Sequence, residues 1–103
     1  MFIYNVTLKV DPSVESDWLN WMRHEHIPEV METNLFLEHK MMQLIYSPFN
    51  DESLGNTFVV QYFFDEMAKY DQYQEIFAPS LQKNHIDRFG EKVLAFRTIL
   101  KYI

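Results

Sequence analysis

The sequence has 103 residues, 48% of them hydrophobic and 17% aromatic, which suits one domain around one core. The formal net charge of -6 excludes the basic surface that nucleic-acid binding needs, and no stretch is apolar for long enough to span a membrane. The chain has no cysteine, which excludes disulfides and thiolate chemistry. The first residues have the pattern of a strand rather than of a signal peptide, so we expect a soluble cytoplasmic protein.

The first half of the chain predicts a strand, a helix and a second strand. Apolar side chains alternate from Phe2 to Val10, which is typical of a strand with one buried face. The residues 11–13 can begin a helix, whose apolar stripe recurs at helical spacing through Val14, Trp18, Trp21, Met22 and Glu25. Pro28 should end or kink this helix, and Asn34 could close a short final turn. A less regular strand follows from Phe36 to Ser47.

The second half repeats this order after a long polar loop from Pro48 to Asn56. A third strand is predicted from Thr57 to Phe64, and Asp65 can cap a second helix. Pro79 should break this helix and can begin another helical segment at its first position. The following segment has one apolar face and ends at Gly90; this face carries Leu81, His85 and Phe89. Val93 to Tyr102 is the fourth predicted strand.

The order β-α-β-β-α-β predicts an α+β fold of the ferredoxin-like type over residues 1–103 as one domain. Such a fold has a four-stranded antiparallel sheet with helices on one face. The third strand carries bulky side chains on both faces, for example Tyr62 on one and Phe63 on the other. A free apolar sheet face should not remain in water, so we expect a homodimer in which two sheets pack face to face.

A W-x-x-W-x-x-x-x-H-x-P cluster, formed by Trp18, Trp21, His26 and Pro28, and several short stretches carry a family resemblance. The stretches are residues 3–7, 18–22, 26–31, 60–63, 78–81 and 95–98. Through them the chain resembles the dimeric α+β barrel superfamily, which includes EthD-like proteins and antibiotic-biosynthesis monooxygenases. It is most similar to an uncharacterised bacterial family known as a domain of unknown function. The resemblance implies dimerisation and a pocket between helices and sheet that the histidine of the first helix, here His26, faces.

Two residues near the end of the first predicted helix are candidate catalytic groups. His26 lies at the edge of the apolar stripe, where it could act as a general acid or base. The alternative is a structural histidine bound to a carbonyl that Pro28 leaves free. Glu25 projects toward the same stripe, so its carboxylate should either pair with a cation, for which Arg97 is a candidate, or have a raised pKa.

Polar residues in the middle of predicted strands are candidate substrate-binding groups. Arg97 lies among apolar residues and needs either an acid such as Glu25, an acid of the partner subunit, or an anionic ligand. In the ferredoxin-like order Asn5, Gln61 and Arg97 can be neighbours on one sheet face, with Tyr62 beside them. The alternative is a polar network that is satisfied within the dimer interface.

Trp18 and Trp21 are either core residues or a surface on which a flat aromatic ligand stacks. No metal site is predicted, since His24 and His26 point away from each other on a helix. Asn5 and His85 lie roughly where haem-degrading relatives keep an asparagine and a proximal histidine. The tryptophan that such relatives carry on the third strand is absent, so we expect no cofactor.

The sequence leaves two main functions open. The first is a cofactor-independent enzyme that isomerises, decarboxylates or oxygenates a small aromatic or polyketide-like acid. In it, His26 shuttles protons, Arg97 holds the anion and the tryptophans stack on the ring. The second is a non-catalytic dimeric ligand-binding or stress-associated module, and a haem-binding monooxygenase is a distant third. A polar-lined pocket with a perturbed histidine favours the enzyme; a filled cavity with His26 bound to main chain favours the module.

Overall fold

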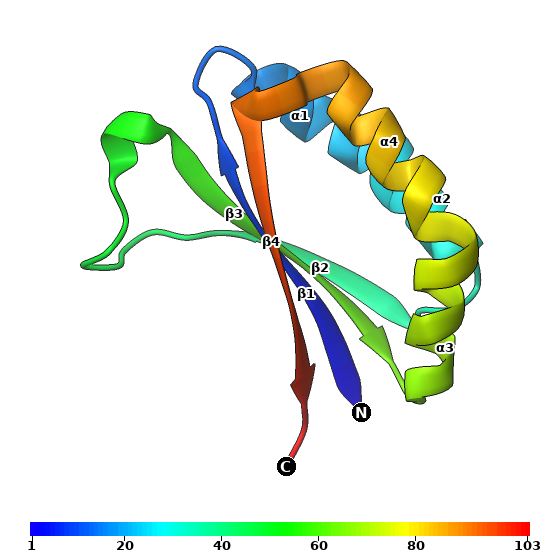
Figure 1. Ribbon diagram of the computed structural model, residues 1–103. Coiled ribbons are helices and arrows are strands. Elements are labelled where there is room, and N and C mark those ends of the chain that lie inside the picture. Colours follow the sequence, from blue (N-terminus) through cyan, green and yellow to red (C-terminus); the bar gives the residue numbers. More distant parts are fainter.

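The computed structural model describes residues 1–103 apart from the side chain of residue 52. Four strands form one antiparallel sheet in the order β2-β3-β1-β4, with helices on one face (Figure 1). The strands are β1 (Phe2–Val10), β2 (Glu38–Gln43), β3 (Asn56–Phe64) and β4 (Val93–Lys101). The predicted ferredoxin-like arrangement is therefore confirmed. Among the described residues, no helix is long and apolar enough to cross a membrane.

Strand β1 has the predicted bounds, whereas β2 is about half as long as the segment from Phe36 to Ser47 that the pattern indicated. Phe36 lies before the strand, yet its side chain is buried in the core. Hydrophobic pattern reports burial rather than strand pairing, so a core residue in a connection extends the predicted strand. Beyond β2, residues 44–55 form a long connection to β3 that contains a short 3-10 turn.

Each half of the helical layer contains two α-helices joined by a π-helical turn. In the first half, α1 (Glu15–Trp21) and α2 (Ile27–Glu32) flank the π turn Met22–His26. In the second half, α3 (Met67–Gln72) and α4 (Ala78–Phe89) flank the π turn Tyr73–Phe77. The helical backbone continues from α1 through the π turn into α2, so the expectation that Pro28 ends the first helix is wrong. Pro79 lies in the first turn of α4, as expected for a proline that begins a further helical segment, although the backbone before it stays helical through the π turn. Each proline lies in the first turn of the helix after the π turn, where its missing N–H is tolerated.

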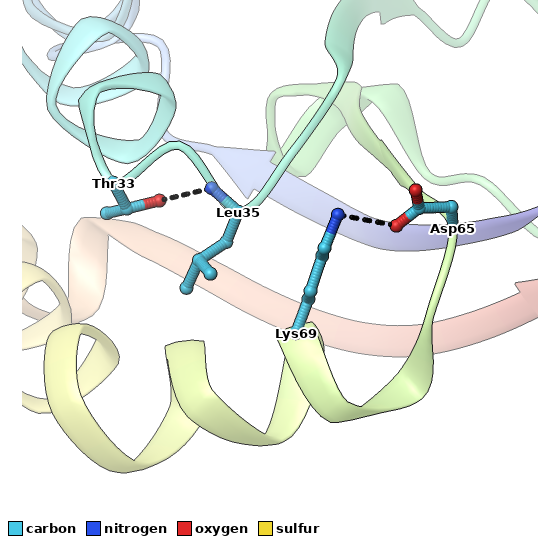
Figure 2. A network of polar contacts seen from close by, with 4 residues as sticks. All are labelled: Thr33, Leu35, Asp65 and Lys69. Carbon is cyan, nitrogen blue, oxygen red and sulfur yellow. Dashed lines mark hydrogen bonds and ion pairs between the residues drawn. The ribbon is translucent and has the colours of Figure 1, made fainter.

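The first helix of each half lacks the predicted side-chain cap. Asp65 forms an ion pair with Lys69 across one helical turn, at 2.8 Å (Figure 2), and Glu66 occupies the cap position. Asp11 instead accepts hydrogen bonds from the backbone N–H and the hydroxyl of Ser13, at 2.8 and 2.7 Å. This closes a turn before α1, because an Asp side chain readily bonds to the backbone two residues on.

The end of α2 follows the prediction. Asn34 has a φ of 62°, the left-handed conformation that stops a helix. The hydroxyl of Thr33 donates to the carbonyl of Val30 at 2.7 Å. It also accepts a bond from the N–H of Leu35 at 3.4 Å, which Figure 2 shows. These bonds turn the chain back toward the sheet.

The hydrophobic core lies between the sheet and the helices. Alternate residues of β1 and β3 face it, and the largest fully buried side chains are Trp18, Phe64, Val10, Val30 and Val60. The other sheet face carries no helix (Figure 1). On this open face, Leu94 and Phe96 of β4 are 63% and 65% exposed. The cavity described next therefore lies on the helix-covered face of the sheet, and the other face is uncovered.

Candidate functional site

A small cavity lies between the sheet and the helices. Its wall consists of Tyr4, Val6, Leu8, Val60, Tyr62 and Arg97 from the strands and of Met22, His26, Tyr73, Gln82 and His85 from the helical layer. The volume of the cavity, measured as the space open to the centre of a water molecule, is about 30 Å³. One water needs roughly 10–15 Å³ by this measure. The cavity therefore admits a small polar group, and a larger ligand has to extend from its mouth.

The π turns bring polar side chains to this wall. His26 is the last residue of the first π turn, and Tyr73 is the first residue of the second. A π turn adds one residue to a helical turn, so residues after it are rotated relative to a regular helix. This rotation places His26 on the cavity side and leaves Glu25 exposed to solvent.

His26 is a half-buried imidazole with one buried, unsatisfied nitrogen. Its Nδ1 has no hydrogen-bond partner among the described residues. The ring stacks on Trp21 at 5.1 Å between centroids and meets the edge of His85 at 6.0 Å. Burial, with smaller effects from His85 and Arg97, lowers the pKa of His26 from 6.5 to about 4. At neutral pH His26 is thus uncharged and retains one free donor or acceptor position.

His85, on α4, is fixed by the indole of Trp18. Trp18 Nε1 donates a hydrogen bond to His85 Nε2 at 3.0 Å. Because an indole nitrogen only donates, Nε2 accepts and the proton of this neutral imidazole resides on Nδ1. Burial first, and then the positive charge of Arg97, lowers the pKa of His85 to about 4. Two uncharged histidines therefore lie side by side at the cavity.

Arg97 brings a positive charge to the cavity without a matching acid. It lies on the edge strand β4 opposite Val6 and is solvent-exposed. The ion pairs among described residues are Lys69–Asp65, Lys83–Asp87 and Arg88–Asp17, so Arg97 has none there. The predicted Glu25–Arg97 pair is wrong. Glu25 lines a separate depression with Trp21, Glu29, Asn84, Asp87 and Arg88.

Asn5 and Gln61 lie on the opposite sheet face from Arg97. In the sheet register Asn5 is paired with Gln61 and Thr98, whereas Arg97 is opposite Val6. Neighbouring residues of a strand point to opposite faces. The expectation that Asn5, Gln61 and Arg97 share one face is therefore wrong.

Asn5 and Gln61 instead form a network on the open face. Gln61 Nε2 donates to Asn5 Oδ1 at 3.1 Å, and Asn5 Nδ2 donates to Thr98 Oγ1 at 3.4 Å. Tyr62, the remaining strand candidate, lies in the cavity wall, and burial raises the pKa of its hydroxyl. Of the strand candidates, the structure thus brings Tyr62 and Arg97 to the cavity.

The two tryptophans contact the histidines of the cavity but do not line it. Trp18 is 0% and Trp21 is 6% exposed, and neither is part of the cavity wall. The tryptophans are thus core residues, the first of the two alternatives, and they offer no stacking surface within the described cavity. Trp18 instead positions His85, and Trp21 packs against His26.

The geometry does not match a haem or metal site. Asn5 and His85 lie on opposite sides of the sheet, so they cannot contact one group together. The described part of the chain contains no group of three side chains with metal-ligand chemistry. The residues present therefore do not fit a haem held by Asn5 and His85.

Four cavity residues with polar groups were not predicted from the sequence as catalytic or substrate-binding residues: Tyr4, Tyr73, Gln82 and His85. His85 was recognisable as a polar residue within the apolar face of Leu81 and Phe89. Tyr73 lies in a predicted helix rich in aromatic residues, where its hydroxyl gives no separate signal. Gln82 has no distinguishing signal, because the sequence shows it as an ordinary polar residue of a helix.

The chain matches the family described as Domain of unknown function (DUF4286) over residues 1–103. It belongs to this family. The resemblance noted in the sequence is thereby confirmed. No curated protein sequence matches the chain significantly.

Solved structures share the fold at low sequence identity. An EthD-family protein from Bacillus halodurans has 14% identity and a TM-score of 0.72, with 100% of both chains covered. A dimeric ferredoxin-like protein from an uncultured marine organism has 10% identity and a TM-score of 0.73, covering 99% of this chain and 95% of that one. A protein assigned to the antibiotic biosynthesis monooxygenases, from Deinococcus radiodurans, has 10% identity and a TM-score of 0.67, covering 100% and 93%. At these identities the likeness concerns the fold alone.

Proposed function

We propose that the protein is a homodimer that binds the charged end of a small organic acid in the cavity. Arg97 holds the anion, and His26 exchanges a proton with it. The observation that carries the proposal is the unsatisfied Nδ1 of His26 in a cavity whose wall also carries Arg97, a guanidinium without an ion pair among the described residues. A carboxylate or enolate oxygen would satisfy both groups, because guanidinium and imidazole both donate hydrogen bonds to it.

Binding of such a ligand would change the protonation of His26. An anion beside the ring stabilises the charged imidazolium and so raises the pKa of His26 from its value of about 4. In an enzyme, the neutral imidazole would take a proton from a carbon next to a carbonyl, and Arg97 would stabilise the enolate. Return of the same proton to another carbon completes an isomerisation, without any further reactant. An aromatic or polyketide-like acid would place its carboxylate or enolate end in the cavity and its ring at the mouth.

The homodimer is supported by the open sheet face. Leu94, Phe96 and Leu100 of β4 are exposed there, around the polar network of Asn5 and Gln61. An exposed apolar patch of this kind marks an interface. Two solved structures with this fold are described as dimeric ferredoxin-like proteins.

A non-catalytic binding protein is the second candidate. The small volume of the cavity and the bond between Trp18 and His85 favour it. This bond occupies one nitrogen of His85, and the dry aromatic surroundings stabilise the neutral rings. A protein that only stores or senses a small acid needs no more than this.

A binding screen separates these functions. The melting temperature of the wild type, of Arg97→Met and of His26→Phe is measured with the sodium salts of benzoate, salicylate, phenylpyruvate and acetoacetate. Lys101→Met, an exposed cation on the same strand, is the control. We expect stabilisation of the wild type and the control by at least one acid, and loss of this effect in Arg97→Met.

Proton exchange then distinguishes catalysis from binding. In D₂O, an enzyme would replace the C–H protons of a bound keto acid by deuterium, which NMR detects, and His26→Phe would abolish the replacement. Binding without exchange supports the second candidate. If no acid stabilises the wild type more than Arg97→Met, the anion site does not exist.

A further inference from the structure

The hydrogen bond between Trp18 and His85 gives one imidazole of the cavity a fixed polarity. Trp18 Nε1 donates to His85 Nε2 at 3.0 Å, so the single proton of the neutral ring is on Nδ1. Which nitrogen of a histidine carries the proton is set by the hydrogen bond that the other nitrogen makes. Trp18 is fully buried, and the low polarity of its surroundings strengthens this bond. His85 is therefore held as a hydrogen-bond donor.

The donating nitrogen of His85 is free to contact a ligand. Its Nδ1 makes no hydrogen bond with the described residues and, unlike Nδ1 of His26, is not closed off from water. His85 lies in the cavity wall, whereas Trp18 does not. The bond to Trp18 thus directs Nε2 away from the cavity, and Nδ1 is the polar atom that this side chain offers to it.

The other polar groups of the cavity wall, apart from Arg97, have no fixed polarity. The tyrosine hydroxyls and the amide of Gln82 can each donate or accept, because a hydroxyl rotates and an amide carries both functions. No hydrogen bond to Nδ1 among the described residues fixes the tautomer of His26. The guanidinium of Arg97 only donates. His85 from α4 and Arg97 from β4 are therefore the two fixed donors of the cavity.

We propose that the bond from Trp18 to His85 makes the cavity selective for carboxylates and enolates over neutral amides. A carboxylate or the enolate of a β-dicarbonyl accepts at two oxygens, so it can bond to His85 Nδ1–H and to Arg97 together. A primary amide of the same shape accepts at one oxygen, and its NH₂ group then faces the second donor. A donor left opposite a donor loses a hydrogen bond without regaining water, which discriminates between ligands of equal size.

This inference rests on the proposed function, in which Arg97 and His26 bind the acid. It adds His85 as a third ligand-binding group. Trp18 does not touch the ligand and acts through His85, so it is a positioning residue.

The tautomer of His85 is measured first, on the protein without ligand. Protein with isotope-labelled histidine is studied at neutral pH by two-bond proton–nitrogen correlation NMR, which distinguishes protonated from unprotonated ring nitrogens. His85→Phe identifies the signals of His85. We expect the proton on Nδ1 in the wild type and its distribution over both nitrogens in Trp18→Phe. Trp21→Phe is the matched control, because Trp21 contacts the same ring at 5.6 Å between centroids without a hydrogen bond to it among the described atoms.

Ligand selectivity is then measured by titration calorimetry with benzoate, salicylate and acetoacetate, each compared with its primary amide. We expect the wild type to prefer the acid that it binds to the corresponding amide. Trp18→Phe should reduce this preference about tenfold or more, the value of one hydrogen bond to a charged group. Trp21→Phe should keep the preference of the wild type. His85→Phe retains an aromatic ring without a donor and should reduce the preference as Trp18→Phe does, so it tests the donor even where Trp18→Phe does not fold.

The outcomes separate this inference from the proposed function. An unchanged preference in Trp18→Phe or in His85→Phe overturns the inference and leaves the proposed acid site intact. A proton on Nε2 of His85 in the wild type, or an equal loss of preference in Trp21→Phe, does the same. If the wild type binds none of the acids, the proposed function is contradicted, and this inference with it.

Discussion

The side chains of the neighbouring residues Glu25 and His26 do not point where a regular α-helix would place them. The π turn Met22–His26 lies between Trp21 and Ile27, both of which are buried. A regular wheel places Glu25 on the apolar stripe and His26 at its edge. The additional residue of the π turn turns His26 to the cavity and Glu25 to solvent.

The lowered pKa values of the two histidines predict a pH dependence of stability. The pKa of His26 is about 4 in the folded protein, against 6.5 for an unperturbed histidine. Below about pH 6.5 the unfolded chain therefore binds more protons than the folded one, and the free energy of unfolding falls as the pH decreases toward 4. We expect His26→Phe to remove about 3 kcal/mol of this loss. Urea unfolding of the wild type and of His26→Phe at about pH 6.5 and about pH 4 measures this loss of stability.

His24→Gln is the matched control for His26→Phe. His24 is exposed, and its Nδ1 lies 2.8 Å from the carbonyl of Asn20. This variant should keep the pH dependence of the wild type. The same slope in His26→Phe as in the wild type would show that His26 titrates normally in the folded protein.

Trp18 combines core packing with one specific hydrogen bond, and two variants separate the contributions. Trp18→Ala should cost about 3–5 kcal/mol, because it leaves a large cavity. Trp18→Phe retains most of the packing and loses the bond to His85, for about 1 kcal/mol. Urea unfolding measures both; a loss below about 1 kcal/mol for Trp18→Ala would be incompatible with a fully buried indole.

Arg97 and Glu25 should act independently in stability. Arg97 is exposed without an ion pair among the described residues, and Glu25 lies in a different depression. In a double-mutant cycle, Arg97→Met and Glu25→Gln should be additive within about 0.5 kcal/mol. Chemical denaturation of the wild type, the two single variants and the double variant provides the cycle. A coupling energy of about 1 kcal/mol or more would be evidence for the Glu25–Arg97 ion pair.

At the scale of elements, the two π turns occupy equivalent places in the two halves of the fold. Each precedes a proline that lies in the first turn of the next helix. Ile27 N–H bonds to the carbonyl of Met22, and Ala78 N–H bonds to that of Tyr73, each five residues back. The chain therefore stays helical up to each proline, where a regular α-helix would lose a bond. Both turns contribute to the cavity, through His26 and Tyr73.

The arm between β2 and β3, residues 44–55, ends at a glycine. Gly55 has a φ of 111°, and a Cβ there would lie 2.0 Å from the carbonyl oxygen of Val10. Gly90 also has a positive φ, 57°, but a Cβ there meets nothing within 4 Å. Gly90→Ala should cost about 1–2 kcal/mol from backbone strain. Gly55→Ala should cost about 3 kcal/mol or more, since a clash adds to the strain.

Thermal unfolding of the two glycine variants compares these costs under identical conditions. The difference between them isolates the close approach of the arm to β1. If Gly55→Ala is no worse than Gly90→Ala, residue 55 does not lie against β1 in solution.

At the scale of the whole molecule, the open sheet face predicts association. Sedimentation at micromolar concentration should give about 25 kDa, twice the 12.5 kDa of one chain. The hydrophobic effect drives this association, so moderate salt should not dissociate the dimer. A mass of one chain at all concentrations would leave Leu94 and Phe96 without cover.

Local pattern was enough to establish the strand β1, the order of the elements and the ferredoxin-like arrangement, because alternation and helical periodicity are properties of neighbouring residues. The π turns could not be predicted from the sequence. Pro28 indicates the end of a helix unless the backbone hydrogen bonds that precede it are known. Which sheet face carries Asn5 and which carries Arg97 depends on pairing between distant strands. The cavity and its unsatisfied histidine therefore follow from tertiary structure alone, which brings His26 and His85 together from helices nearly sixty residues apart.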